Sequence, residues 1–186
     1  DSPSRSLRFR ARERRAQAIG TWVHEGFAHV GWIEDAMPAD WDRWLQAPAD
    51  LAPGDREAAS RDLEQTLGLA STRELLRRVA PGDLLWRERR FEILDEERWV
   101  SGVFDRVQIH EWDSLEGPWA RVIDLKTDDG VGTPEGLARA LERHREQLRL
   151  YARVVPMLVD RPLRRVETWL LFTKGPGAAL VDRSSV

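Results

Sequence analysis

Apolar positions in the first part of the chain predict helices. From residue 8 to residue 34 they recur at the spacing of one helix face, as Trp22, Val23, Phe27, Val30 and Ile33. The same spacing returns over residues 56–79, where the predicted core positions are Leu63, Leu67, Leu75 and Leu76. Segment 36–56 lies between them and is rich in Pro, Asp and Trp, so we expect a loop with a short helix. Pro81-Gly82-Asp83 ends this helical part.

The second part of the chain predicts strands with one helix among them. The strands are expected at 84–94, 99–112, 120–127, 166–173 and 178–183. The helix is expected from about Pro134 to Val155, with Thr133 as its N-cap and Pro134 at its first position. The predicted order is therefore helices, three strands, a helix and two strands.

Composition narrows the class of protein. The 186 residues are enough for one domain with a core, and 41% hydrophobic with 33% charged residues is typical of a globular protein. No apolar run approaches the roughly 20 residues that a membrane helix requires. The absence of cysteine excludes disulfides, thiolate zinc sites and iron–sulfur clusters, and fits a cytoplasmic protein.

The charge distribution argues against a protein that simply coats DNA. The formal net charge is −3, whereas such proteins are usually basic. An enzyme that gathers carboxylates around metal ions can nevertheless be acidic and still touch DNA locally. Of the 29 basic residues only Lys126 and Lys174 are lysines, which draws attention to the position of Lys126.

Acidic side chains on two predicted strands are candidates for chemistry. Asp124 and Lys126 are two residues apart and share a strand face, while Ile123 and Leu125 point into a core. By themselves, Asp124 and Lys126 are equally well explained as a surface ion pair.

Asp105 lies on the preceding strand, with Val103 and Val107 on the same predicted face. If the two strands form a hairpin, Asp105 approaches Asp124, and two neighbouring carboxylates repel unless a cation lies between them. Mg²⁺ or Mn²⁺ suits such an oxygen-rich site.

Three further positions have both a functional and a plain structural interpretation. Glu88 lies on the first predicted strand and could equally be a solvated position among arginines. Gln147 and Tyr151 share a helix face, which by itself indicates a packing face with an amide at its rim. His24 lies on a stripe of small residues that lets another backbone approach, although a lone helical histidine is usually packed or exposed; the stripe consists of Gly20, Ala28 and Gly31.

The order of these motifs is more specific than any one of them. GTxxH, ExxF, GxxDR, DLKT and QLxxY follow one another over residues 20–151. This series resembles the C-terminal nuclease domain of the RecB and AddA helicase–nucleases. The resemblance implies the α+β fold of PD-(D/E)XK, restriction-endonuclease-like nucleases, in which helices flank a mixed central sheet. It further implies a single nuclease domain over 1–186, with a helical N-terminal part and lid at 1–82 and a sheet core with its flanking helix at 83–186.

The resemblance also implies a Mg²⁺ or Mn²⁺ site. His24 matches the N-terminal metal ligand of the family. Asp105 and Asp124 match its two central catalytic carboxylates, and the main-chain carbonyl of Leu125 completes the ligand set.

Further family roles fall on side chains beside the metal site. Lys126 would position or activate the attacking water, Gln147 and Tyr151 would support the site and contact DNA, and Glu88 would have a supporting role. The family often has tyrosine three residues before the glutamine. Here that residue is His144, which removes the basis for base stacking at this position.

The function implied is a metal-dependent DNA exonuclease, part of a helicase–nuclease in double-strand-break repair and recombination. The expected partners are single-stranded DNA and a helicase domain or partner subunit. No P-loop motif is present, so we expect either a fragment of a larger helicase–nuclease or a stand-alone relative. Two alternatives are a catalytically inactive DNA-end-binding or scaffolding domain and a generic α+β interaction module. Of the nine tryptophans, we expect most in the core or an interface, with Trp41 and Trp44 as the best candidates for an exposed surface.

Overall fold

The computed structural model describes residues 3–35, 40–95 and 97–185. Its helices are α1 (Pro3–His29), α2 (Asp40–Gln46), α3 (Pro53–Gly68), α4 (Ala70–Leu76) and α5 (Pro134–Leu158). Its strands are β1 (Leu84–Asp95), β2 (Arg98–His110), β3 (Trp119–Lys126), β4 (Arg165–Phe172) and β5 (Ala178–Ser185). The predicted element order is confirmed. Of the segment predicted as a loop with a short helix, residues 36–39 lie outside the described residues, and the short helix is α2.

The strands form one mixed five-stranded sheet in the order β1-β2-β3-β4-β5. Three neighbouring pairs are antiparallel, and β3 and β4 are parallel. Parallel strands require a crossover connection, and α5 provides it. The chain is therefore a mixed α+β protein with helices flanking its sheet, as predicted.

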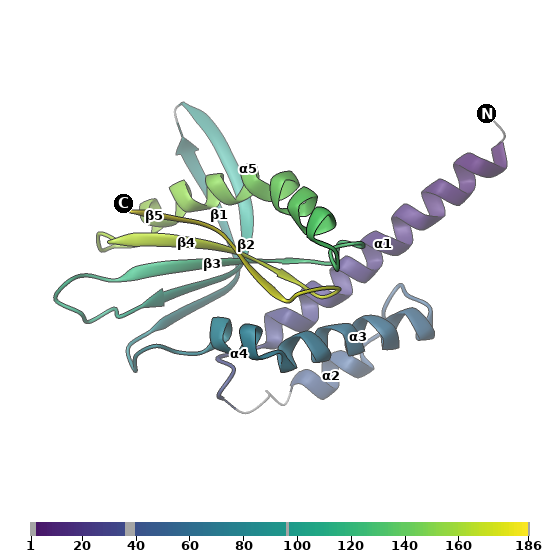
Figure 1. Cartoon of the computed structure of the whole chain (residues 1–186), viewed down its shortest axis with the longest axis horizontal. Helices are drawn as coiled ribbons and strands as arrows, with labels where there is room; N and C mark the ends of the chain where they lie inside the picture. Colours follow the sequence, from purple (N-terminus) through teal and green to yellow (C-terminus); the bar gives the residue numbers. More distant parts are fainter. Residues whose placement is uncertain (1–2, 36–39, 96, 186) are drawn as a thin grey trace.

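Each face of the sheet has its own apolar core. Helix α5 lies over one face, where Leu148 and Val154 pack with Val122 of β3. Helices α1, α3 and α4 lie on the other side (Figure 1), and their cluster includes Ile123 and Leu125 of β3. Alternate residues of β3 thus serve opposite cores, which confirms that Ile123 and Leu125 point away from Asp124.

The tryptophans at the second helix are buried, which contradicts the prediction of an exposed surface there. Trp41 and Trp44 are 8% and 4% exposed. Trp44 stacks on Trp22 of α1 with ring centroids 4.8 Å apart, and Trp41 packs against Trp44 at 4.6 Å. The space for Trp44 exists because Gly26 of α1 has no side chain: a Cβ there would lie 2.4 Å from the indole ring. Trp99, in β2, is 72% exposed instead.

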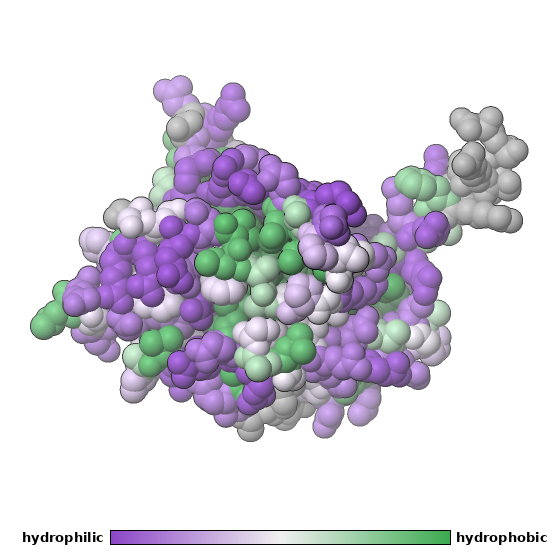
Figure 2. Space-filling view, viewed as in Figure 1, coloured by the Kyte–Doolittle hydropathy of each residue, from purple (hydrophilic) through white to green (hydrophobic). Residues whose placement is uncertain are grey.

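Helix α5 begins as its sequence predicts. The Oγ1 atom of Thr133 accepts a hydrogen bond from the backbone amide of Gly136 at 3.1 Å, and Pro134 occupies the first turn. The helix continues to Leu158, past the predicted end at Val155. No helix in the described part of the chain is sufficiently long and apolar to cross a membrane. Polar side chains cover most of the face shown in Figure 2, with apolar ones gathered near its middle.

Candidate functional site

The candidate site lies where β2 and β3 stop pairing. Their antiparallel register runs from His110 opposite Trp119 to Arg106 opposite Ile123, which confirms the predicted hairpin. One residue further along, the carboxylate of Asp105 replaces the backbone ladder, and its Oδ2 accepts the Leu125 amide at 2.7 Å. This bond holds Asp105 beside the Asp124–Leu125 peptide, so the two acids are neighbours in the fold.

The hairpin of β1 and β2 is irregular at the same level. Phe104 and Val107 belong to one core cluster although they are an odd number of residues apart, so strict alternation is broken between them. The prediction that Val103, Asp105 and Val107 share one face is therefore wrong. The physical reason lies opposite Asp105, where Glu88 has a φ of 46°. A non-glycine residue in this left-handed region is strained by about 1–3 kcal/mol, and such strain is typically found at functional sites.

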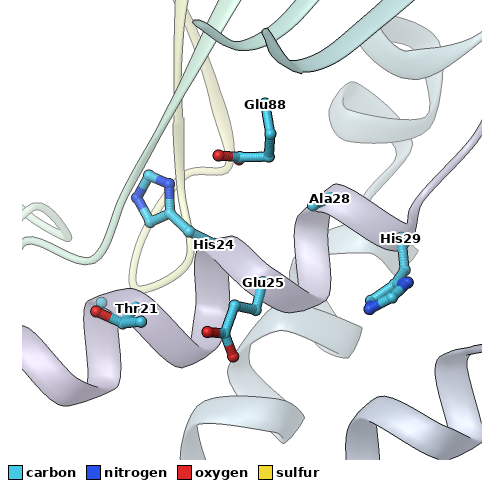
Figure 3. A pocket seen from close by; sticks show the side chains of 7 residues that line it. Thr21, His24, Glu25, Ala28, His29 and Glu88 are labelled. Atoms are coloured by element: carbon cyan, nitrogen blue, oxygen red, sulfur yellow. The ribbon is translucent and has the colours of Figure 1, made fainter. Parts of the chain in front are cut away.

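His24 reaches this point from α1. Its Nδ1 atom lies 3.2 Å from Oδ1 of Asp105. The side chains of His24 and Glu88 extend into the same space from α1 and β1, whereas His29 points away (Figure 3). That space is an open pocket of about 560 Å³, lined by Gly20, Thr21, His24, Glu25, Ala28, His29 and Glu88. The predicted stripe of small residues thus forms one wall of the pocket.

Three side chains form a group that could hold a metal ion. His24, Glu88 and Asp105 each offer a ligand atom, and these atoms all lie within 4.8 Å of one another. Of the predicted ligands, His24 and Asp105 belong to this group and Asp124 does not. Glu88, for which a supporting role was predicted, takes the third place. Leu125 contributes its amide to Asp105, and the ligand role of its carbonyl stays a prediction.

Asp124 instead pairs with Lys126 and with α5. The Lys126 Nζ atom lies 2.6 Å from Oδ2 of Asp124. The Gln147 amide links both, because its Oε1 accepts from Lys126 at 3.3 Å and its Nε2 donates to Oδ1 of Asp124 at 3.3 Å. Gln147 also donates to the Tyr151 hydroxyl at 2.9 Å, and that hydroxyl donates to the Val103 carbonyl at 2.8 Å. These contacts join the helix face predicted from Gln147 and Tyr151 to both strands.

Burial and crowding of acids shift the proton affinities at the site. Burial, together with the charge of Asp105, raises the pKa of Asp124 to about 6 despite the ammonium of Lys126. The same two causes raise the pKa of Glu88. Burial alone would lower the pKa of His24, but its hydrogen bond to Asp105 and the nearby carboxylates outweigh burial and raise it. Burial raises the pKa of Tyr151 to about 12, so its hydroxyl stays protonated.

The donor set fits a hard divalent cation. Three carboxylates crowd into one place, which is unfavourable without a positive charge between them. Oδ2 of Asp124 is buried and accepts no hydrogen bond of normal geometry from any described residue, although the Lys126 ammonium is close. Carboxylate oxygens with one imidazole suit Mg²⁺ or Mn²⁺ rather than a thiolate-binding metal.

Two features near the site were missed by the sequence reasoning. His144 contacts Asp128, with its Nε2 3.1 Å from the carboxylate, and burial together with Lys126 lowers its pKa. The adjacent acids of the DLKTDD segment were the only available signal for this pair. The ligand position of Glu88 had no signal at all, since the left-handed backbone that places it cannot be read from an ordinary strand sequence.

Comparison with known proteins adds no relative to this geometry. The sequence matches no model of a protein family, and it matches no curated protein.

Proposed function

We propose that this protein is a metal-dependent deoxyribonuclease that hydrolyses phosphodiester bonds. The observation that carries the proposal is convergence: an imidazole, three carboxylates and an ammonium group meet at one pocket although they come from α1, β1, β2 and β3. The order of the sequence motifs, which resembles that of the RecB and AddA nuclease domains, supports the same reaction class.

The metal-binding residues in this proposal are His24, Glu88 and Asp105, with Asp124 beside them. When bound, a divalent ion supplies the positive charge that makes water acidic and neutralises the phosphate oxygens. Asp105 orients the site in two directions, because one of its oxygens contacts His24 and the other accepts the Leu125 amide. Its geometry is therefore set before any ligand arrives.

Lys126 places a positive charge where the phosphate becomes more negative. Its ammonium is held between Asp124 and Gln147, and a charge fixed in advance stabilises a transition state without reorganisation. Gln147 keeps Lys126 and Asp124 in register, and Tyr151 anchors Gln147 to β2. A proton can be accepted from water at Asp124, whose raised pKa of about 6 is close to working pH.

The substrate in this proposal is single-stranded DNA delivered by a helicase domain or partner subunit, with 5′-phosphate and 3′-hydroxyl products. The biological setting is double-strand-break repair and recombination. These finer statements rest on the motif resemblance. The open pocket beside α1 is compatible with an extended strand, since the metal-binding group lies at its wall.

The test is cleavage of labelled single-stranded DNA with Mg²⁺ or Mn²⁺. Asp124→Ala and Lys126→Ala should each reduce the rate by about 100-fold or more, the usual scale for losing a charged group at a reaction centre. Asp160→Ala and Lys174→Ala are matched controls that should cleave like wild type. No cleavage by wild type, or equal cleavage by all four variants, would end the proposal. DNA binding that is indifferent to metal would support a non-catalytic DNA-end-binding domain instead.

A further inference from the structure

Two arginines close the C-terminal end of α1, the helix that carries His24. The last carbonyls of a helix have no partner within the helix. Here Arg106 donates to the carbonyls of Val30 at 2.8 Å and Gly31 at 2.7 Å. Arg87 donates to the two preceding carbonyls, those of Ala28 at 2.8 Å and His29 at 3.2 Å. We call Arg87 and Arg106 the arginine clasp. They lie directly opposite each other in the β1–β2 pair.

Arg106 is an unusual residue to find in this place. Its side chain is fully buried, and within the described part of the chain no carboxylate forms an ion pair with it. Burying a guanidinium without an acid is costly, and burial lowers the pKa of Arg106 to about 9. Phe27 and Trp32 cover its plane with ring centroids 5.8 and 5.7 Å away. An apolar side chain would fill this space more cheaply, so the charged group needs a reason.

The reason is suggested by the neighbour of Arg106 in the chain. Asp105 contacts His24 of α1 and the Leu125 amide of β3. Arg106 holds the same helix six residues further along, through Val30. The Asp105–Arg106 dipeptide therefore fixes α1 at two points about 9 Å apart along the helix. Two fixed points set both the depth and the rotation of a helix, and the rotation decides where the His24 imidazole lies.

We propose that the arginine clasp, and Arg106 above all, is a positioning element that seats His24 in the metal-binding group. The inference rests on the proposed metal site and explains the arginine of the GxxDR motif, to which the hydrolytic reaction assigns no role. Metal ligands tolerate displacements of only about 0.2 Å, so a small shift of α1 would weaken binding without unfolding the protein.

The experiment measures Mn²⁺ affinity by calorimetry on the full chain, together with the thermal midpoint. His24→Ala, Arg106→Lys, the double variant, and Arg87→Gln are compared with Arg90→Gln, a control from the same strand as Arg87. Arg106→Lys keeps the charge but lacks the fork that reaches two carbonyls, so affinity should fall about tenfold. The double variant should bind no more weakly than His24→Ala alone, because Arg106 acts through His24. Arg90→Gln should bind like wild type.

Other results would overturn the inference. Unchanged affinity in Arg106→Lys, or losses that add in the double variant, would show that Arg106 only stabilises the fold. If Arg106→Lys does not fold, Arg87→Gln decides, since Arg87 is less buried than Arg106: unchanged affinity there would contradict the clasp. Failure of the proposed function has a different signature, because His24→Ala and Asp105→Ala would then bind Mn²⁺ as wild type does.

Discussion

Asp124 is the residue at which stability and chemistry conflict. It is 1% exposed, and burial with the charge of Asp105 raises its pKa to about 6. An unfolded aspartate ionises near a pKa of about 3.9. Above pH 6 the folded protein must therefore carry a charge that the unfolded chain carries at lower cost. The penalty is fully present above pH 6 and disappears below the unfolded pKa, where the group is protonated in both states.

Asp124→Asn should therefore stabilise the metal-free protein while abolishing cleavage. At pH 8 with a chelator, we expect the free energy of unfolding to rise by about 2 kcal/mol, the scale of a shift of this size. The gain should vanish near pH 4. Urea denaturation at both pH values measures it, with Asp160→Asn as the control. An Asp124→Asn protein that is less stable than wild type at pH 8 would contradict this account of Asp124.

At the scale of elements, α1 is positioned by contacts on several sides. Its buried face packs against α3 and the sheet, and Gly26 provides the space in which Trp44 stacks on Trp22. The indole of Trp22 also donates to Ser60 of α3 at 2.9 Å. Since His24 lies between Trp22 and Gly26, the seat of α2 and the position of the candidate ligand depend on the same two turns of helix.

Gly26→Ala and Gly68→Ala should have opposite effects on stability. A Cβ at Gly26 would lie 2.4 Å from the Trp44 ring, so the stack must open, at a cost of about 1–3 kcal/mol. A Cβ at Gly68 meets nothing within 4 Å, and alanine should stabilise α3 by about 0.5–1 kcal/mol. Thermal unfolding of both variants measures the difference. A Gly26→Ala protein as stable as wild type would show that Trp44 does not pack as described.

At the scale of the whole molecule, a second buried ion-pairing group joins the helical part to the sheet. His110 ends β2, and its Nδ1 lies 2.6 Å from Oδ2 of Asp83. The imidazole lies between Trp32 and Trp119, with ring centroids 5.9 and 4.3 Å away. Its Nε2 is buried without a hydrogen-bond partner among the described residues. The neutral form, with the proton on Nδ1 and donated to Asp83, is therefore the stable one.

This pair should make the protein sensitive to acid. Burial lowers the pKa of His110 below its ordinary value, so below about pH 6.5 the unfolded chain binds a proton that the folded protein does not. The contribution to stability is thus present at neutral pH and lost as the pH falls. Burial would raise the pKa of Asp83, but His110 and three backbone amides lower it, and its contribution is lost at still lower pH.

His110→Asn should remove part of this acid sensitivity. The asparagine amide can donate to Asp83 in place of Nδ1, but it takes up no proton. We expect a lower free energy of unfolding at pH 7 and a smaller further decrease between pH 7 and pH 5 than in wild type. His24, whose raised pKa acts in the opposite direction, is present in both proteins and cancels. An unchanged pH slope in urea denaturation would rule out His110 as the titrating group.

Local sequence determined every element of this fold and part of its site. Periodicity separated helices from strands because side-chain direction repeats every 3.6 residues in one and every two in the other. Thr133 capped α5 through its own side chain, and Asp124 faced Lys126 because strand neighbours two apart share a face. These features depend on residues close together in the chain, so the sequence alone could predict them.

Tertiary structure decided what depends on distant contacts. Glu88 joins His24 and Asp105 because its backbone turns left-handed opposite Asp105, and Trp41 and Trp44 are buried because Gly26 leaves room on another helix. No local pattern contains these facts, since each requires two segments to meet in space. The chain thus specified its elements one at a time, and only their packing selected which side chains share the pocket.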